Sequence, residues 1–240
     1  MQFSSLVVLA DAHVGAPRGC PVDQLLEFLI SAHTRGDGLV IAGDLFHFWF
    51  GTERRPAARH ETLLAALEAT ARRMPLIVLG GNHDRWGSGA WAERRGLAWH
   101  RDEVELGVGD HRVLVLHGDQ LGARGPANAA VHAVIGSAFT SAVFRAMPPA
   151  MAWHLADRMA EATYDDSPAS RVAATGAAVR GADRLLATRP DVGWLITGHT
   201  HVAGIRQLAS GQRHLNPGPW FEGGRYATLT PTGATLHTLD

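Results

Sequence analysis

Residues Leu76–Asp84 read Leu-Ile-Val-Leu-Gly-Gly-Asn-His-Asp, an apolar run that ends in side chains able to bind metal. A short apolar run rich in β-branched residues and bounded by glycine is typical of a strand buried on both faces of a sheet. In open α/β sheets, the ligand crevice lies at the carboxyl ends of such strands. The stretch therefore predicts that Asn82, His83 and Asp84 lie at a binding edge of an α/β sheet.

Four other apolar runs also end in metal-binding side chains. Leu6–Leu9 precedes Asp11 and His13, Leu39–Ile41 precedes Asp44, Val113–Leu116 precedes His117, and Trp194–Ile196 precedes His199 and His201. A lone Asp-x-His or Gly-Asp is common in loops, and a lone histidine is more often a hydrogen-bonded structural residue than a ligand. Gly-Asn-His-Asp and Gly-His-Thr-His are more specific, because each packs several ligand types into four residues. Five such motifs in one chain predict that the strand ends converge on one metal centre.

The ligand types indicate two metal ions and phosphoryl chemistry. Imidazole nitrogen mixed with carboxylate and amide oxygen suits Mn, Fe or Zn, and the lack of cysteine in the motifs argues against a closed structural zinc site. Two ions roughly 3.5–4 Å apart share an anion, polarise a phosphoryl group and stabilise the charge of in-line displacement. Asp44 is the natural bridge, since Gly43 lets the backbone approach closely.

Two residues that follow Asn82 have predicted catalytic roles. His83 is placed to touch a phosphate oxygen or to protonate a leaving group. Asp84 is predicted to orient the His83 ring through a hydrogen bond, as carboxylates do for many functional histidines.

These motifs resemble those of the calcineurin-like metallophosphoesterase superfamily over essentially the whole chain. The resemblance implies an α/β fold in which a two-sheet β-sandwich is flanked by helices, with His83 as the catalytic histidine. One implied metal site consists of Asp11, His13, Asp44 and His201. The other implied site consists of Asp44, Asn82, His117 and His199.

A narrower resemblance comes from residues that flank the motifs. Gly43–Gly51 reads Gly-Asp-Leu-Phe-His-Phe-Trp-Phe-Gly, and His117–Leu121 reads His-Gly-Asp-Gln-Leu. Both are similar to UDP-2,3-diacylglucosamine diphosphatases, which cleave a pyrophosphate in lipid A synthesis to UMP and 2,3-diacylglucosamine 1-phosphate. The resemblance implies an acylated UDP-sugar substrate and two divalent ions, Mn first, with Fe, Co or Zn as alternatives. Many members of that family have arginine where this chain has His83, and this chain has no lysine, so the exact substrate stays open.

An apolar insertion is expected at about 120–170. Its large apolar residues are Ile135, Phe139, Val143, Phe144, Met147, Met151, Trp153, Leu155 and Met159. Pro148-Pro149 is expected to break the segment into two helices. One interpretation is a lid whose apolar face receives acyl chains and whose rim lies on a membrane surface. The alternative is a helical hairpin that buries its own core; the family resemblance favours the lid.

Several other side chains are candidates for substrate contacts. Trp49 either stacks on a base or a sugar or packs in the core. Arg85 and Arg124 are candidates for neutralising phosphate, although exposed arginines are common. His47 is a candidate for the pocket wall. Asn216–Gly218 resembles a turn that closes the site in this superfamily.

Composition bears on partners and compartment. The formal net charge is −1 and no basic run occurs, so a nucleic-acid partner is not expected. Cys20 is the one cysteine and cannot form an internal disulfide, which suggests a reducing compartment. Met1–Ala10 reads as a strand and not as a signal peptide, and no run reaches the ~20 apolar residues of a spanning helix. We therefore expect a cytoplasmic protein that makes at most peripheral contact with the inner face of the membrane.

One catalytic domain over residues 1–240 is expected, because the motifs are spread along the chain and no linker separates them. Helices are expected at Val22–Thr34, Ala57–Met74 and Val172–Thr188. A hairpin turn is expected at Gly107–Asp110, and closing strands at Val202–Gln207, Tyr226–Thr230 and Ala234–Thr238.

The leading hypothesis is hydrolysis of the pyrophosphate of a lipid-linked UDP-sugar. The first alternative is a metallophosphoesterase that acts on a soluble nucleotide or small phosphodiester. The second is a non-catalytic scaffold of the same fold that binds a protein partner. Such scaffolds tend to lose metal ligands, whereas this chain retains all the ligand positions, and this favours an enzyme.

Overall fold

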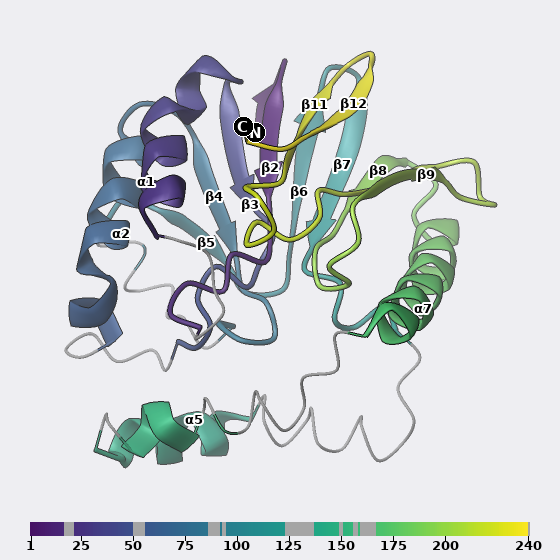
Figure 1. Cartoon of the computed structure of the whole chain (residues 1–240). Coiled ribbons are helices and arrows are strands. Elements are labelled where there is room, and N and C mark those ends of the chain that lie inside the picture. Colours follow the sequence, from purple (N-terminus) through teal and green to yellow (C-terminus); the bar gives the residue numbers. More distant parts are fainter. Residues whose placement is uncertain are drawn as a thin grey trace.

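Two six-stranded sheets face each other at the centre of the computed structural model, with helices on both outer faces (Figure 1). The structure describes residues 1–16, 22–49, 56–85, 92, 95–122, 137–148, 151–155, 158 and 167–239. The predicted α/β class, with a two-sheet sandwich flanked by helices, is confirmed.

One sheet carries the first three motif strands. In spatial order it consists of β12 (Gly233–His237), β11 (Tyr226–Thr230), β2 (Leu6–Leu9), β3 (Gly38–Ile41), β4 (Leu76–Leu79) and β5 (Ala98–His100). Strands β2, β3 and β4 run parallel, and Ile41 lies opposite Leu9 on one side and Val78 on the other. The three strands consequently end at the same edge, and the loops that follow them lie side by side.

The other sheet carries the remaining two motif strands. Its spatial order is β1 (Gln2–Phe3), β6 (Glu103–Val108), β7 (His111–Leu116), β8 (Val192–Ile196), β10 (Arg213–Asn216) and β9 (Gly204–Gln207). Strands β7 and β8 are parallel, with Val115 opposite Ile196. Just beyond them, the Gly198 N–H donates to the His117 carbonyl over 2.9 Å, so these two loops also meet.

The motif strands are apolar on both faces because each face packs against a different layer. The apolar layer between the two sheets includes Val8, Val40, Ile77, Val115 and Ile196. Their neighbours in sequence point outward, with Val7, Leu39 and Val78 in one outer layer and Leu114 and Leu195 in the other. Side chains alternate along a strand, so burial on both faces produces the continuous apolar runs seen in the sequence.

The helices cover these outer layers. Helices α1 (Val22–Ser31) and α2 (Pro56–Ala71) cover the sheet that contains β2, and α7 (Pro168–Ala187) covers the sheet that contains β8 (Figure 1). Among the described residues, no helix combines the length and the apolar character needed to cross a bilayer.

The insertion between β7 and α7 contains helix α5 (Ala138–Ala146), which lies apart from the two sheets in Figure 1. Residues 151–155 are also helical, so the predicted break at Pro148 is confirmed. Phe144 and Ala152 pack against Phe48, which belongs to the loop after β3. Ile135, Pro149, Met159 and the side chain of Phe139 lie outside the described residues.

Several predicted boundaries are wrong by a few residues. Helix α7 begins at Pro168 and not at Val172, because the Ser167 side chain caps it by accepting from the Ser170 N–H over 3.2 Å. Helix α2 ends at Ala71 instead of Met74. Helix α1 ends at Ser31 and continues as a 3₁₀ turn over Ala32–Thr34, so the predicted helical end is confirmed.

The strand predictions missed weakly apolar strands. Strand β10 was not predicted because it carries Arg213 and Asn216 at its ends, yet its interior is buried where it pairs with both β8 and β9. The strand predicted over Met1–Ala10 is divided into the two-residue β1 and the four-residue β2, and the three-residue β5 was missed. Gly107 belongs to β6, which shortens the predicted hairpin turn, and β9 begins at Gly204 and not at Val202.

Truncation of Phe28 on α1 should destabilise the fold strongly. Its side chain is 2% exposed and its ring contacts that of Trp220, with centroids 4.7 Å apart. Phe28→Ala should lower the free energy of unfolding by about 3–5 kcal/mol, and the melting temperature by roughly 10 °C. Ile30 on the same helix is 59% exposed. Ile30→Ala should therefore change stability by less than about 0.5 kcal/mol. Thermal unfolding followed by circular dichroism measures both, and equal losses would contradict this packing.

Candidate metal centre

The predicted metal ligands stand out by their backbone conformation. Among the described residues, positive φ angles in residues other than glycine occur only at five positions. They are Asp11 (53°), His13 (47°), Asp44 (50°), His199 (67°) and His201 (54°). An L-residue in the left-handed region costs of order 1–3 kcal/mol and persists only where its surroundings impose it. All five belong to the predicted ligand set, so the fold stabilises these strained conformations at one functional site.

Backbone hydrogen bonds between the loops impose these conformations. The N–H groups of Asp11 and His13 donate to the carbonyls of Gly43 and Asp44, over 3.1 and 2.9 Å. The His199 N–H donates to both oxygens of Asp11, over 3.1 and 3.0 Å. The loops after β2, β3 and β8 therefore form one connected unit.

Two glycines allow the loops to approach this closely. A Cβ atom on Gly81 would lie 2.1 Å from Oδ1 of Asp44, and one on Gly43 would lie 2.4 Å from Nδ1 of His117. Both glycines thus make room for ligand side chains. The prediction that Gly43 permits close approach is confirmed.

Asp11, His13 and His201 form one group of ligand atoms that lie within 4.8 Å of one another. The Nε2 atoms of the two histidines are 3.4 Å apart, and Nε2 of His201 is 3.8 Å from Oδ1 of Asp11. A second group consists of Asp11, Asp44 and His117. The two groups share Asp11 and lie side by side.

Asp44 belongs to the second group and also lies close to His13, a member of the first group. Its Oδ2 is 3.2 Å from Nε2 of His117 and 3.8 Å from Nε2 of His13, while its Oδ1 accepts from the His83 N–H over 2.8 Å. Asn82 completes this side, because its Oδ1 is 3.1 Å from Nε2 of His117. This is the position expected of a carboxylate shared between two cations.

The rings of His117 and His199 also face each other, with centroids 5.2 Å apart. Nδ1 of His117 lies 2.9 Å from the Ala42 carbonyl, which can only accept, so this nitrogen carries a proton and Nε2 is directed at the centre. The structure thus brings together all seven predicted ligands in a nitrogen and oxygen set that suits a transition metal or zinc.

The pKa values of His117 and Asp44 indicate that the centre stabilises a positive charge next to the Asp44 carboxylate. Burial alone would lower the pKa of His117, but the adjacent Asp44 carboxylate raises it to about 10. Burial alone would raise the pKa of Asp44, but His117 and His83 hold it well below its usual range. The protein without metal therefore keeps one proton where the geometry suits a cation.

For three other predicted ligands, burial is the largest influence on the pKa. Burial lowers the pKa of His199 to about 3, with a contribution from His117, and lowers the pKa of His13 well below its usual range. Both rings are consequently neutral and able to bind metal at physiological pH. Burial raises the pKa of Asp11, partly offset by His201.

The prediction that Asp84 orients His83 is wrong. Asp84 is fully buried, and its oxygens accept from the N–H groups of Gly81 and Phe46, over 2.7 and 3.1 Å. The His83 ring is oriented by the His47 carbonyl, 2.9 Å from its Nδ1. Asp84 therefore joins the loops after β3 and β4 and acts on the site through their backbone. Burial, and to a smaller extent Asp44, raises the pKa of Asp84 to about 6.

Two of the three predicted substrate residues, Trp49 and Arg85, lie in the part of the chain that the structure describes. Trp49 is 1% exposed and packs on Phe46, which supports the packing alternative left open by the sequence. Arg85 forms an ion pair of 2.6 Å with Asp119 and so connects the loops after β4 and β7. Arg124 lies outside the described residues.

Sequence reasoning did not predict two side-chain contacts that support the His199–His201 loop. Asn216 Nδ2 donates to the Gly198 carbonyl over 2.7 Å, although the sequence suggested only a turn at this position. Arg171 on α7 donates to the His201 carbonyl over 3.4 Å and pairs with Glu222 over 2.6 Å. No local motif marks Arg171, because its partners come from distant parts of the chain.

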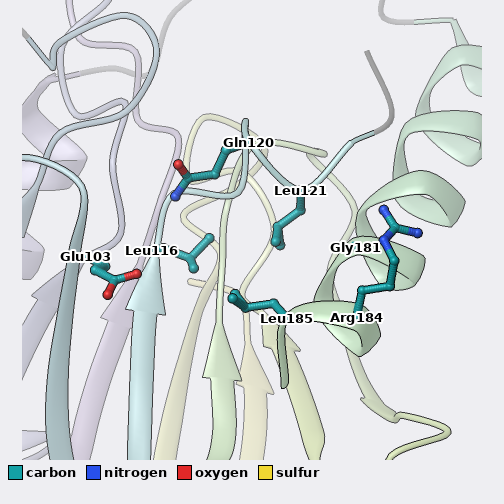
Figure 2. Close-up of a pocket in the computed structure, with 7 residues that line it drawn as sticks. All are labelled: Glu103, Leu116, Gln120, Leu121, Gly181, Arg184 and Leu185. Carbon is teal, nitrogen blue, oxygen red and sulfur yellow. The ribbon is translucent and has the colours of Figure 1, made fainter. Parts of the chain in front are cut away.

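A separate hollow lies between the end of β7 and α7 (Figure 2). Its lining residues are Glu103, Leu116, Gln120, Leu121, Gly181, Arg184 and Leu185. Leu116, Leu121 and Leu185 point toward one another in Figure 2. None of the seven metal residues lines this hollow, so it is distinct from the metal centre.

The chain matches the family model for calcineurin-like phosphoesterases over residues 4–203. It belongs to that family. Curated relatives include a UDP-2,3-diacylglucosamine hydrolase of Escherichia coli O81 (strain ED1a), 27% identical over 232 residues that cover 95% of this chain and 96% of the relative. The enzyme of the same name from Shigella sonnei matches with the same identity and coverage.

A solved structure, that of Vacuolar Protein Sorting 29 from Cryptosporidium parvum, is similar in fold with a TM-score of 0.50 and 13% identity. The alignment covers 99% of this chain and 92% of that one. This calcineurin-like phosphoesterase is a metal-dependent hydrolase. Three observations support this: the family match, the hydrolase relatives and the groups of possible metal ligands.

Removal of the Asp44 carboxylate should abolish metal binding and catalysis together. Asp44→Ala should lower hydrolysis of a chromogenic phosphodiester by at least about a hundredfold and reduce bound metal, because the shared anion is lost. The exposed Asp102 provides a matched control, and Asp102→Ala should leave both unchanged. Elemental analysis and the hydrolysis rate measure the two effects, and full activity of Asp44→Ala would refute the assigned role.

The metal-free protein should lose stability as the pH rises from 7 to 10. The pKa of His117 is about 10 in the fold, compared with an ordinary value of 6.5 for histidine. Its stabilising contribution is fully present below pH 6.5 and is lost as the pH rises through 10. Melting temperatures of the chelator-treated protein should fall by several degrees over this range. His117→Asn should flatten the profile, and an unchanged slope in this variant would contradict the assignment.

Proposed function

We propose that the protein hydrolyses the pyrophosphate bond of UDP-2,3-diacylglucosamine to UMP and 2,3-diacylglucosamine 1-phosphate, with two manganese ions. Relatives of that name match the chain over nearly its whole length at 27% identity, which supports the proposal without specifying the substrate. The motif Gly43–Gly51 and the retained ligand set support it further.

One ion would be held by Asp11, His13, Asp44 and His201. The other would be held by Asp44, Asn82, His117 and His199. When bound, such ions act as Lewis acids on the phosphoryl group and lower the pKa of water.

The protein side chains position the substrate and move the proton. In the net reaction, a water molecule loses one proton to solvent and its oxygen forms a bond to one phosphorus. The bond from that phosphorus to the bridging oxygen breaks, with its electron pair left on that oxygen. His83, with Nδ1 fixed on the His47 carbonyl, would present Nε2 to a phosphoryl oxygen. In its protonated form it would donate to the departing phosphate.

One observation supports an acylated substrate above others: an apolar cluster lies directly beside His83. The rings of Phe48 and His83 have centroids 5.3 Å apart. Phe48 in turn packs against Phe144 and Ala152 of the insertion. Apolar side chains next to a phosphoryl site suit a substrate with acyl chains close to its phosphates.

The same insertion also presents apolar side chains to solvent. Met151 is 54% exposed, Leu155 37% and Val143 36%. We place them in a lid at about 120–170 within a single catalytic domain over residues 1–240. Such residues would lie on the cytoplasmic face of the membrane, from which a lipid substrate would enter.

Arg85 and Arg124 would contact the substrate phosphates in this proposal. Arg85 is paired with the buried Asp119, so it reaches a phosphate only by sharing that partner or exchanging it. Trp49 is assigned to packing on the basis of its burial.

The proposal is tested by product analysis. The Mn-loaded protein, incubated with UDP-2,3-diacylglucosamine in mixed micelles, should release UMP, detected by chromatography. A much faster hydrolysis of a soluble nucleotide or small phosphodiester would overturn the lipid assignment in favour of a generic phosphoesterase, which the retained His83 would suit.

Aspartates introduced at the exposed apolar positions of the insertion should show whether the insertion binds the acylated substrate or only supports the fold. The double variant Met151→Asp, Leu155→Asp should lower turnover of the acylated UDP-sugar by roughly tenfold or more, since about 1.5–3 kcal/mol of apolar contact is lost per side chain. Hydrolysis of a chromogenic phosphodiester should stay within about twofold. Ile30→Asp, which changes an exposed apolar residue on α1, is the control. Equal losses with both substrates would make the insertion purely structural.

A further inference from the structure

A third group of possible metal ligands lies beside the metal centre, and two of its three histidines, His47 and His83, are outside the seven predicted ligands. His13, His47 and His83 each offer a ligand atom, and these atoms lie within 4.8 Å of one another. His47 is 8% exposed and His13 is 8% exposed, so the cluster is largely shielded from solvent. The assigned metal sites use His13 but leave His47 without a function.

The local backbone holds His47 in place. Its N–H donates to the Val14 carbonyl over 3.0 Å, which fixes the loop after β3 against the loop after β2. The His47 ring is stacked on that of His83, with centroids 5.5 Å apart and an angle of 29° between the planes. The His13 ring lies 4.8 Å from His83 and 6.2 Å from His47 by centroids.

The hydrogen bond of His83 determines which of its nitrogens can bind a cation. Its Nδ1 lies 2.9 Å from the His47 carbonyl, and a carbonyl oxygen accepts only. Nδ1 must therefore carry the proton, and in the neutral ring Nε2 keeps its lone pair. This is the arrangement found in histidine ligands, where the other nitrogen donates to a carbonyl.

We propose that His13, His47 and His83 form a third cation site, which takes zinc when zinc is in excess. Three imidazoles with a fourth, open position are a ligand set that zinc adopts at about 2.0–2.1 Å per nitrogen. Manganese prefers oxygen ligands and is a poor match to an all-nitrogen set. The site is therefore selective for zinc over the manganese of the proposed function.

Zinc at this site inhibits the enzyme. Nε2 of His13 faces His201 at 3.4 Å, within the group that binds the first catalytic ion. A ligand nitrogen binds one ion at a time, so zinc in the third site competes for His13. It also occupies Nε2 of His83. The inference requires only a metal-dependent hydrolase and goes beyond the identity of the substrate.

Zinc counting tests the site directly. Equilibrium dialysis of the protein against a zinc series, followed by elemental analysis, should find about one more zinc ion per chain in the wild type than in His47→Gln. His33 is exposed on the 3₁₀ turn after α1, and His33→Gln is the matched control that should retain the wild-type count. His47→Phe, which keeps a ring against His83, should reproduce the loss if His47→Gln is poorly folded by circular dichroism.

Inhibition provides the second measurement. Added zinc should inhibit the Mn-loaded wild type and His33→Gln on a chromogenic phosphodiester. The His47 variants, each compared with its own zinc-free rate, should require at least about tenfold more zinc for the same inhibition. An equal zinc count in wild type and both His47 variants, or unchanged inhibition in those variants, would overturn the proposal. Neither result depends on the UDP-sugar assay, so the two proposals fail independently.

Discussion

The buried carboxylate of Asp44 is the constraint on which the rest of the structure depends. It lies 2% exposed at the junction of the two sheets, where it faces His117 at 3.2 Å and His13 at 3.8 Å. A buried charge is costly unless it is paired and hydrogen-bonded, so histidines and backbone N–H groups must surround it. The close approach of Gly81 to Asp44 and the hydrogen bond from the His83 N–H to Oδ1 of Asp44 meet this requirement.

The two-sheet architecture meets this constraint. Parallel strands end at a common edge, and two such edges, from β2–β4 and from β7–β8, face each other across an apolar layer. Each edge contributes ligands that the other lacks, since Asp44 comes from one and His117 from the other. The rigid strands thus hold the ligand atoms in register, which offsets the strain of five left-handed residues.

The insertion packs beside this polar centre through apolar side chains. Phe48 follows Asp44 by four residues and contacts both His83 and Phe144. The loop that supplies Asp44 therefore also supplies the apolar contact with α5. The same loop carries His47, whose carbonyl oxygen lies 2.9 Å from Nδ1 of His83, so the insertion and the His83 ring contact one segment of the chain.

Much of the fold and the ligand set could be predicted from the sequence. Strands such as β2 and β4 were placed to the residue, because burial on both faces leaves an uninterrupted apolar run that no surface element shows. Gly-Asn-His-Asp and Gly-His-Thr-His predicted ligand-type side chains at one site, and the fold brings these side chains together, because several metal-binding types in four residues rarely occur for another reason. Residues with this local signature were found without reference to their partners.

Other features were decided only by the tertiary structure. Strand β10 exists because β8 and β9 pair with it, and Arg171 and Asn216 reach the ligand loop from distant segments. The partners of Asp84 are backbone N–H groups, which leave no trace in the sequence, so the sequence alone suggested His83 instead. Local sequence determines which side chains can bind a metal, whereas hydrogen bonds between distant segments determine which way each side chain points.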